Sequence, residues 1–99
     1  MYRFIRTATV KNAALLPSAL GFASQVTAHL NKAHALNMRF GAEQFGGANI
    51  HWHFDADSLD KMQHINETLM EDREYNTLLN KFKDTWAEGS MRDTVIRLI

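Results

Sequence analysis

Two histidines, His51 and His53, stand two residues apart in an alternating segment, which is the most chemically suggestive spacing in the chain. Consecutive side chains of a β-strand point to opposite faces, so both imidazoles project from the same face. His-x-His on a strand is a metal-ligand spacing, and Glu43 offers a third ligand for non-haem iron or another divalent metal. Alternatively, these residues and Arg39 form hydrogen bonds and ion pairs across a subunit interface or along a pocket wall. A lone His-x-His is a weak motif, so we assign no metal.

An aromatic stripe, Tyr75, Phe82 and Trp86, recurs at helical spacing. Such a stripe is typical of a hydrophobic core. The alternative is that, together with Trp52, it lines a pocket between a helix and the sheet. Arg6 is the one charged residue on an otherwise apolar strand face, and a buried arginine needs a partner. It therefore either extends to the edge of the sheet or binds an anionic ligand in the helix–sheet cleft.

A third candidate, His64, lies between Met62 and Ile65 on an amphipathic segment. If His64 faces the sheet, it is suited to act as a general base or a haem ligand, since histidine changes charge near neutral pH. If it does not, it is an ordinary histidine at the boundary of a helix.

These residues lie on a regular alternation of strand and helix patterns. The expected elements, in chain order, are a strand over 2–10, a helix over 16–35, strands over 38–45 and 50–55, a helical region over 59–86 and a strand over 94–99. Pro17 suits a first helical turn, and Ser58 is a suitable N-cap. The glycine-containing turn 46–49 joins the two middle strands into a hairpin. The charged run 71–74 interrupts the second helical region and is expected to be solvated, which leaves either one kinked helix or two helices in series.

The order β-α-β-β-α-β predicts a single α+β domain over residues 1–99, with the ferredoxin-like arrangement of a four-stranded antiparallel sheet. Lys plus Arg and Asp plus Glu both number 11, so no basic excess favours nucleic acid or a membrane surface. The absence of cysteine excludes disulfides and favours a cytoplasmic protein. The apolar run 13–23 resembles a secretion signal, but its helical period continues through Leu30, so we expect it to belong to the domain.

The sheet face that the helices leave uncovered is expected to meet a second chain. A domain of 99 residues has a modest core, and without disulfides a partner is the leading support. The uncovered face is mixed rather than plainly polar. It collects Arg3, Ile5, Thr7, Arg39, Glu43, His51, His53, Asp55, Ile96 and Leu98.

The chain resembles the dimeric α/β-barrel superfamily, which includes antibiotic-biosynthesis monooxygenase-like and NIPSNAP-like domains. The resemblance covers the whole chain in element order, and its local cues are Asp72-Arg73-Glu74-Tyr75 before two leucines and Glu88-Gly89-Ser90 before the last strand. It implies a homodimer whose two sheets pack face to face, with ligands between sheet and helices or near the barrel. It also makes haem binding conceivable through a histidine, a tryptophan and an asparagine, for which His64, Trp52 and Asn49 or Asn66 supply the residue types.

The sequence therefore favours a homodimeric α/β-barrel protein that binds a small apolar or aromatic molecule in a helix–sheet cleft. The rivals are a cofactor-free monooxygenase, a metal- or haem-dependent oxygenase, and a structural or interaction module. No cofactor is assigned. The candidate catalytic residues are His51, His53 and Arg39. The candidate ligand-binding residues are Arg6, Trp52, His64, Tyr75, Phe82 and Trp86.

Overall fold

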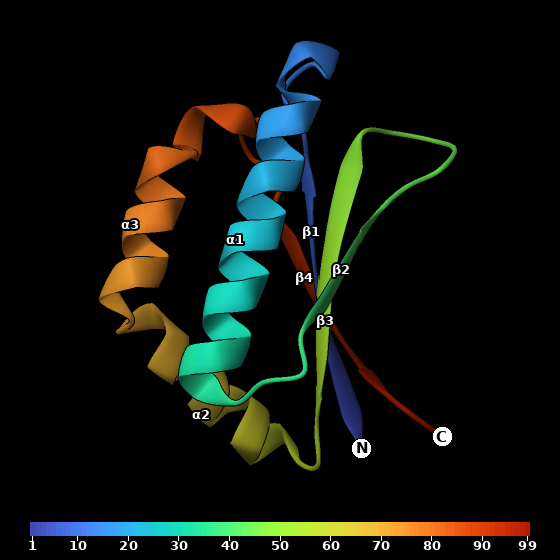
Figure 1. Cartoon of the computed structure of the whole chain (residues 1–99). Helices are drawn as coiled ribbons and strands as arrows, with labels where there is room; N and C mark the ends of the chain where they lie inside the picture. Colours follow the sequence, from blue (N-terminus) through green and yellow to red (C-terminus); the bar gives the residue numbers. More distant parts are fainter.

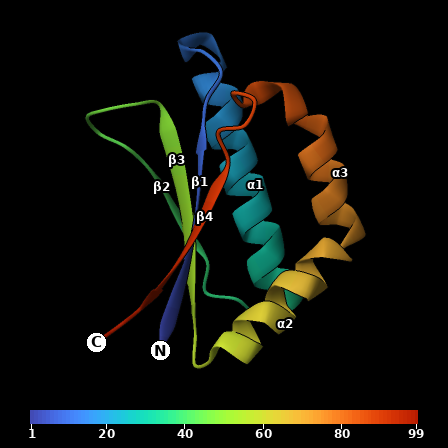
Figure 2. The ribbon, with the colours of Figure 1, turned by 180° about the vertical axis from the view of Figure 1, so that it is seen from behind.

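The computed structural model describes residues 1–99 as two layers, a four-stranded sheet with all its helices on one face (Figures 1 and 2). The strands are all antiparallel and lie in the order β2-β3-β1-β4. The elements are β1 (Tyr2–Thr9), η1 (Ala13–Leu15), α1 (Leu16–His34), β2 (Arg39–Ala42), β3 (Asn49–Ala56), α2 (Leu59–Met70), α3 (Arg73–Lys81), η2 (Lys83–Thr85) and β4 (Arg92–Arg97). The predicted ferredoxin-like α+β class is confirmed.

The helices begin where the sequence supplies caps. Ser58 Oγ accepts a hydrogen bond from the backbone N–H of Lys61 and starts α2, as expected. Asp72 caps α3 in the same way by accepting from the N–H of Tyr75. The interruption at 71–74 therefore separates two helices in series, which was one of the two alternatives. α1 ends at His34, and its C-cap Ala35 has a left-handed φ of 52°.

Three expected boundaries were wrong. β2 ends at Ala42 because the Glu43 carboxylate accepts hydrogen bonds from Gly47 N–H and Asn49 Nδ2, which folds residues 43–48 into a loop. The last strand is Arg92–Arg97, not 94–99. The helical region does not reach Trp86, which pairs instead with Val10 as an isolated extended bridge.

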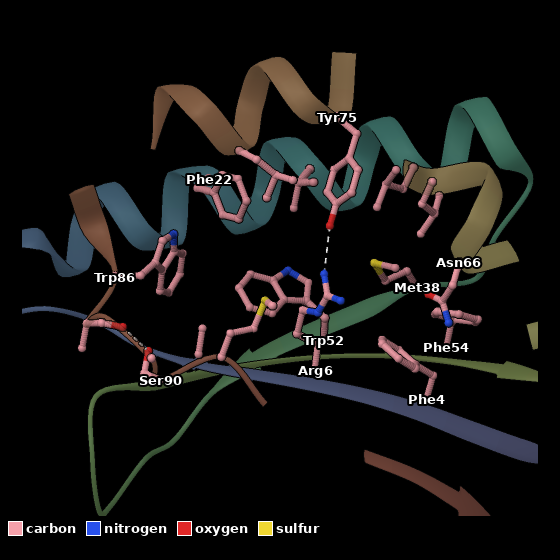
Figure 3. Close-up of a pocket in the computed structure, with 18 residues that line it drawn as sticks. Phe4, Arg6, Phe22, Met38, Trp52, Phe54, Asn66, Tyr75, Trp86 and Ser90 are labelled. Atoms are coloured by element: carbon pink, nitrogen blue, oxygen red, sulfur yellow. Dashed lines mark hydrogen bonds between the residues drawn. The ribbon is translucent and has the colours of Figure 1, made fainter. Parts of the chain in front are cut away.

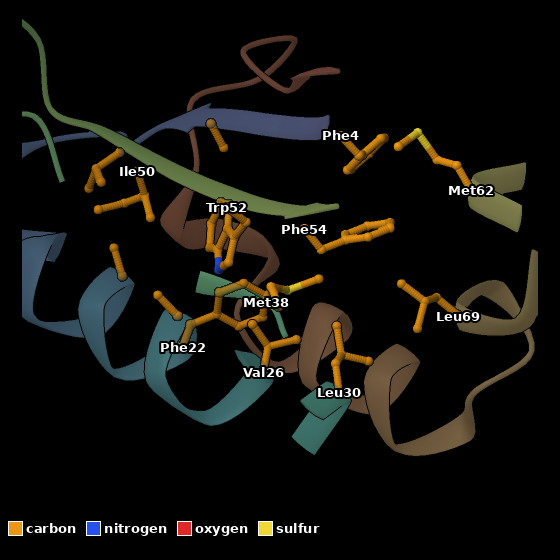
Figure 4. Close-up of a cluster of buried hydrophobic side chains, with 14 of the residues drawn as sticks. Phe4, Phe22, Val26, Leu30, Met38, Ile50, Trp52, Phe54, Met62 and Leu69 are labelled. Atoms are coloured by element: carbon orange, nitrogen blue, oxygen red, sulfur yellow. The ribbon is translucent and has the colours of Figure 1, made fainter. Parts of the chain in front are cut away.

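The core lies between the sheet and the helices (Figure 4). β3 supplies it with Ile50, Trp52 and Phe54, which alternate with exposed or half-buried neighbours. Phe22, Val26 and Leu30 cover them from α1; each of these is at least 96% buried, which requires close contact between the layers. None of the helices combines the length and the hydrophobicity that spanning a bilayer requires.

Candidate functional site: a cavity between the sheet and the helices

A cavity of about 420 Å³ lies between the covered face of the sheet and the three α-helices (Figure 3). This volume is in the range of small-molecule sites, which are mostly apolar with a few placed polar groups. Fourteen of the 18 lining residues are hydrophobic. The lining is Phe4, Arg6, Ala8, Phe22, Val26, Leu30, Met38, Trp52, Phe54, Asn66, Leu69, Tyr75, Leu79, Trp86, Ala87, Gly89, Ser90 and Met91.

The indole N–H of Trp52 has no hydrogen-bond partner within the chain although it is fully buried. Trp52 is only 6% exposed, and its nitrogen points from the sheet toward the helices (Figure 3). Phe22 and Trp86 pack edge-on against its ring, with centroids 6.0 and 5.7 Å away, and this fixes the ring's orientation. A buried donor left unpaired costs about 1–3 kcal/mol, so an acceptor that reached it from the cavity, with a shift of the surrounding side chains, would recover free energy. The other buried polar atom without a partner, Thr27 Oγ1, lies on α1 outside the lining.

Arg6 brings a positive charge to the cavity wall. Its Nε and Nη2 donate to the two carboxylate oxygens of Asp93 at 2.7 and 3.0 Å, and its Nη1 donates to the Tyr75 hydroxyl at 3.1 Å. The hydrogen bond to Asp93 raises the pKa of Arg6 against the opposing effect of burial, so the guanidinium stays charged. Because Tyr75 accepts from Arg6, its own hydroxyl hydrogen remains free to donate.

The remaining polar groups of the lining are Asn66 and Ser90. Ser90 Oγ already donates to the Ala87 carbonyl at 2.6 Å and accepts from the Thr9 N–H at 3.1 Å. No carboxylate, histidine or cysteine is among the lining residues. The cavity therefore has mostly apolar walls, two indole rings, and a guanidinium beside a phenol.

No protein-family model matches the chain, and no curated protein matches it. Solved structures do. A NIPSNAP family protein of unknown function from Agrobacterium tumefaciens is 23% identical, with a TM-score of 0.78 over 97% of this chain and 86% of that one. A NIPSNAP domain protein from Burkholderia xenovorans is 13% identical, with a TM-score of 0.81 over 100% and 95%. An antibiotic biosynthesis monooxygenase is 6% identical, with a TM-score of 0.77 over 100% and 99%.

The chain has the NIPSNAP-like fold. The predicted resemblance is confirmed at the level of the fold, which antibiotic biosynthesis monooxygenases share. At these identities the likeness concerns the arrangement of the elements and carries no assignment of individual site residues.

Within this NIPSNAP-like fold the predicted ligand-binding residues divide into two groups. Arg6, Trp52, Tyr75 and Trp86 line the cavity, and Arg6 also reaches the edge strand β4 through Asp93. Phe82 packs behind the lining against Phe22, with centroids 5.3 Å apart. His64 is exposed on α2 and does not line the cavity.

The residues considered for haem binding do not come together in one place. Trp52 and Asn66 line the cavity, but His64 is exposed. Asn49 lies outside the cavity lining and hydrogen-bonds Thr9 and Glu43 instead.

The predicted catalytic residues lie on the open face of the sheet. His51 Nδ1 is 2.9 Å from Thr7 Oγ1, and its Nε2 is 3.1 Å from Glu43 Oε1. His53 stands opposite Arg39 in the pairing of β2 with β3. None of these histidine and arginine side chains lines the cavity. His51 instead borders a second, polar hollow of about 400 Å³.

The metal alternative for His51, His53 and Glu43 is not supported by the geometry. The hydrogen bonds from Asn49 and His51 lower the pKa of Glu43, which is consistent with a paired carboxylate. The only three histidine or acidic side chains whose ligand atoms converge are His29, His34 and Asp72.

Sequence reasoning missed this second histidine group. His29 lies off the apolar stripe of α1, and Asp72 belongs to the charged run that was expected to be solvated. That expectation was wrong for Asp72, whose side chain is 8% exposed because it caps α3 and faces both imidazoles. The contact joins residues 38 to 43 positions apart, and no local pattern predicts it.

Proposed function

We propose that the protein binds a small, mainly apolar aromatic molecule that carries a hydrogen-bond acceptor, such as a carbonyl or phenolic oxygen. The unpaired indole N–H of Trp52 carries this proposal, because a buried donor beside a mostly apolar cavity favours a ligand whose acceptor reaches it when the neighbouring side chains shift. The name of the monooxygenase neighbour gives no substrate, so the ligand class rests on this chain's own residues.

Arg6 and Tyr75 extend the same preference. Asp93 balances the charge of Arg6, but the guanidinium N–H groups that Asp93 and Tyr75 leave free can donate to a ligand oxygen, and the Tyr75 hydroxyl offers a second donor beside them. Phe22, Trp52 and Trp86 supply aromatic surfaces inclined to one another, which suit a flat ring.

The test uses a matched pair of probes. 1-Tetralone is a bicyclic aromatic ketone, and tetralin has the same carbon skeleton without the oxygen. Calorimetric titration is expected to show saturable binding of tetralone and weaker binding of tetralin. A protein that binds neither, or that binds both equally, contradicts the proposal.

Two exposed leucines provide a matched pair of variants for that titration. Leu79 lines the cavity and is 39% exposed, whereas Leu20 lies outside the lining on α1 and is 40% exposed. Leu79→Trp is expected to fill the cavity mouth and abolish tetralone binding. Leu20→Trp is expected to bind like the unmodified chain, which controls for the added indole.

We also propose that two copies pair through the open face of the sheet. That face carries Ile5 and Ile96 among polar residues, and all the helices lie on the opposite face (Figure 1). Sedimentation velocity at micromolar concentration is expected to give twice the chain mass of 11.3 kDa. A stable single chain contradicts this assembly. The cysteine-free sequence further supports a cytoplasmic location.

A further inference from the structure

Two histidines of α1 converge on one carboxylate at the junction of α2 and α3. His29 Nε2 lies 2.8 Å from Asp72 Oδ2, and His34 Nε2 lies 2.5 Å from the same oxygen. The three ligand atoms lie within 4.8 Å of one another. The side chains are 16%, 19% and 8% exposed, so the group is largely enclosed yet reachable from solvent.

His29 is placed between two carboxylates. Its Nδ1 lies 3.1 Å from Glu74 Oε2, while its Nε2 faces Asp72. A neutral imidazole has one N–H and one lone pair, so it donates to only one of these oxygens. The other contact then sets a lone pair against an anion. A cation between Nε2 and Asp72, either a second proton or a metal ion, removes that repulsion.

We propose that His29, His34 and Asp72 form a binding site for a divalent transition-metal ion such as Zn²⁺. Zinc holds histidine nitrogen at about 2.0–2.1 Å and carboxylate oxygen at about 2.0–2.2 Å, which places tetrahedral ligands roughly 3.3 Å apart. The two nitrogen–oxygen separations, 2.8 and 2.5 Å, are shorter than this, so both histidines must move away from Asp72 to admit the ion. The fourth position is left for water.

Glu74 supports the site from outside. A ligating histidine commonly donates its other ring N–H to a carboxylate, which fixes the tautomer and the ring orientation. Glu74 Oε2 occupies that position next to His29 Nδ1. With Nδ1–H committed to Glu74, Nε2 presents its lone pair to the ion. The bound ion joins α1 to the start of α3 and is expected to stabilise the fold.

The test is a zinc titration of the full chain without a histidine tag, after treatment with a chelator. Calorimetry is expected to give one zinc ion per chain, and zinc is expected to raise Tm. In His29→Gln and His34→Gln the amide N–H still reaches toward Asp72, but glutamine is a poor zinc ligand. Each variant is therefore expected to weaken the zinc Kd by at least about tenfold.

The other histidine pair is the matched control. A His51→Gln, His53→Gln double variant removes two histidines outside the group and is expected to keep the original zinc Kd. Tm values measured in chelator show whether any variant is less stable without metal, which separates loss of the site from loss of the fold. Absence of saturable zinc binding by the unmodified chain overturns the proposal. So does the reverse pattern, in which the His51→Gln, His53→Gln variant loses zinc binding while His29→Gln and His34→Gln retain it.

Discussion

On the open face of the sheet, Arg3 pairs with Asp55 and His51 bonds both Thr7 and Glu43, whereas on the covered face Trp52 keeps an unpaired N–H. Both faces are built from alternate residues of the same strands. Several polar groups of the open face are therefore paired with one another. The covered face combines tight apolar packing with a cavity and a donor that nothing in the chain satisfies.

The comparison shows that residue type alone is a poor guide to where a site lies. The open face holds the residues most associated with chemistry, yet Thr7 and Glu43 already engage both ring nitrogens of His51. On the covered face the informative atom belongs to Trp52, which the sequence places either in the core or in the wall of a pocket. An unmet hydrogen-bonding need in an enclosed space is the stronger indication of a ligand.

The largest expected difference between the faces is in stability. Phe54 on the covered face is 1% exposed, so Phe54→Ala is expected to lower the free energy of unfolding by about 3–5 kcal/mol. Thr94, on the open face and exposed in the single chain, gives the contrast: Thr94→Ala is expected to change the free energy of unfolding of the single chain by less than about 0.5 kcal/mol. Urea denaturation measures both. If the two substitutions lowered the free energy of unfolding by similar amounts, the two faces would not differ in their contribution to stability.

The next effect concerns the unpaired donor. Trp52→Phe keeps an aromatic ring and removes the N–H, so it is expected to weaken tetralone binding about tenfold and leave tetralin unchanged. Without ligand, removing the unsatisfied N–H stabilises the variant, and this offsets part of the stability that is lost because the smaller ring leaves a cavity. Trp86→Phe is the control, since its N–H also lacks a partner in the chain but is not fully buried. Equal losses for both probes would show that Trp52 acts by shape alone.

Stability in acid is expected to distinguish Asp72, at the junction of α2 and α3, from Asp55 on the open face. Burial raises the pKa of Asp72, but hydrogen bonds from Tyr75 N–H, His34 and His29 outweigh this and lower it to about 2. Because the folded pKa lies below the ordinary value of 3.8, the unfolded chain takes up the proton first as pH falls. The contribution of Asp72 is therefore complete above about pH 4 and is lost as pH falls toward about 2.

Substitution is expected to expose this contribution. Asp72→Asn keeps the helix cap and removes the charge, so its Tm should fall less between pH 4 and 2 than that of the unmodified chain. Asp55 lies on the open face, and its hydrogen bond with Arg3 lowers its pKa. Asp55→Asn is expected to change the dependence of Tm on pH less than Asp72→Asn does, because water screens the Arg3–Asp55 pair. Parallel Tm curves for the unmodified chain and Asp72→Asn would contradict the assignment.

The smallest expected effect is on ligand binding by the open-face histidines. Neither His51 nor His53 lines the cavity, so a His51→Gln, His53→Gln double variant is expected to keep the tetralone Kd within about twofold. Calorimetry under the conditions used for the unmodified chain measures this. A large loss of affinity with the fold intact would move the ligand to the open face.

The sequence was sufficient to predict the fold and some of the residues that line the cavity. Strand alternation placed Trp52 on the covered face, and helical spacing placed Tyr75 toward the sheet. It was insufficient where contacts between distant residues decide the outcome. The pairing of His29 with Asp72 depends on how α3 packs on α1, and the satisfaction of His51 depends on the course of the loop that carries Glu43. Neither follows from local periodicity.

The most direct test of the central claim is the nuclear magnetic resonance signal of the Trp52 indole N–H. The chain has two tryptophans, so Trp86→Phe assigns the two indole signals without ambiguity. Tetralone is expected to move the Trp52 signal downfield as a hydrogen bond forms, while tetralin leaves it close to its starting position. If tetralone saturates the protein and the Trp52 signal does not move, the unpaired donor is not what the ligand recognises.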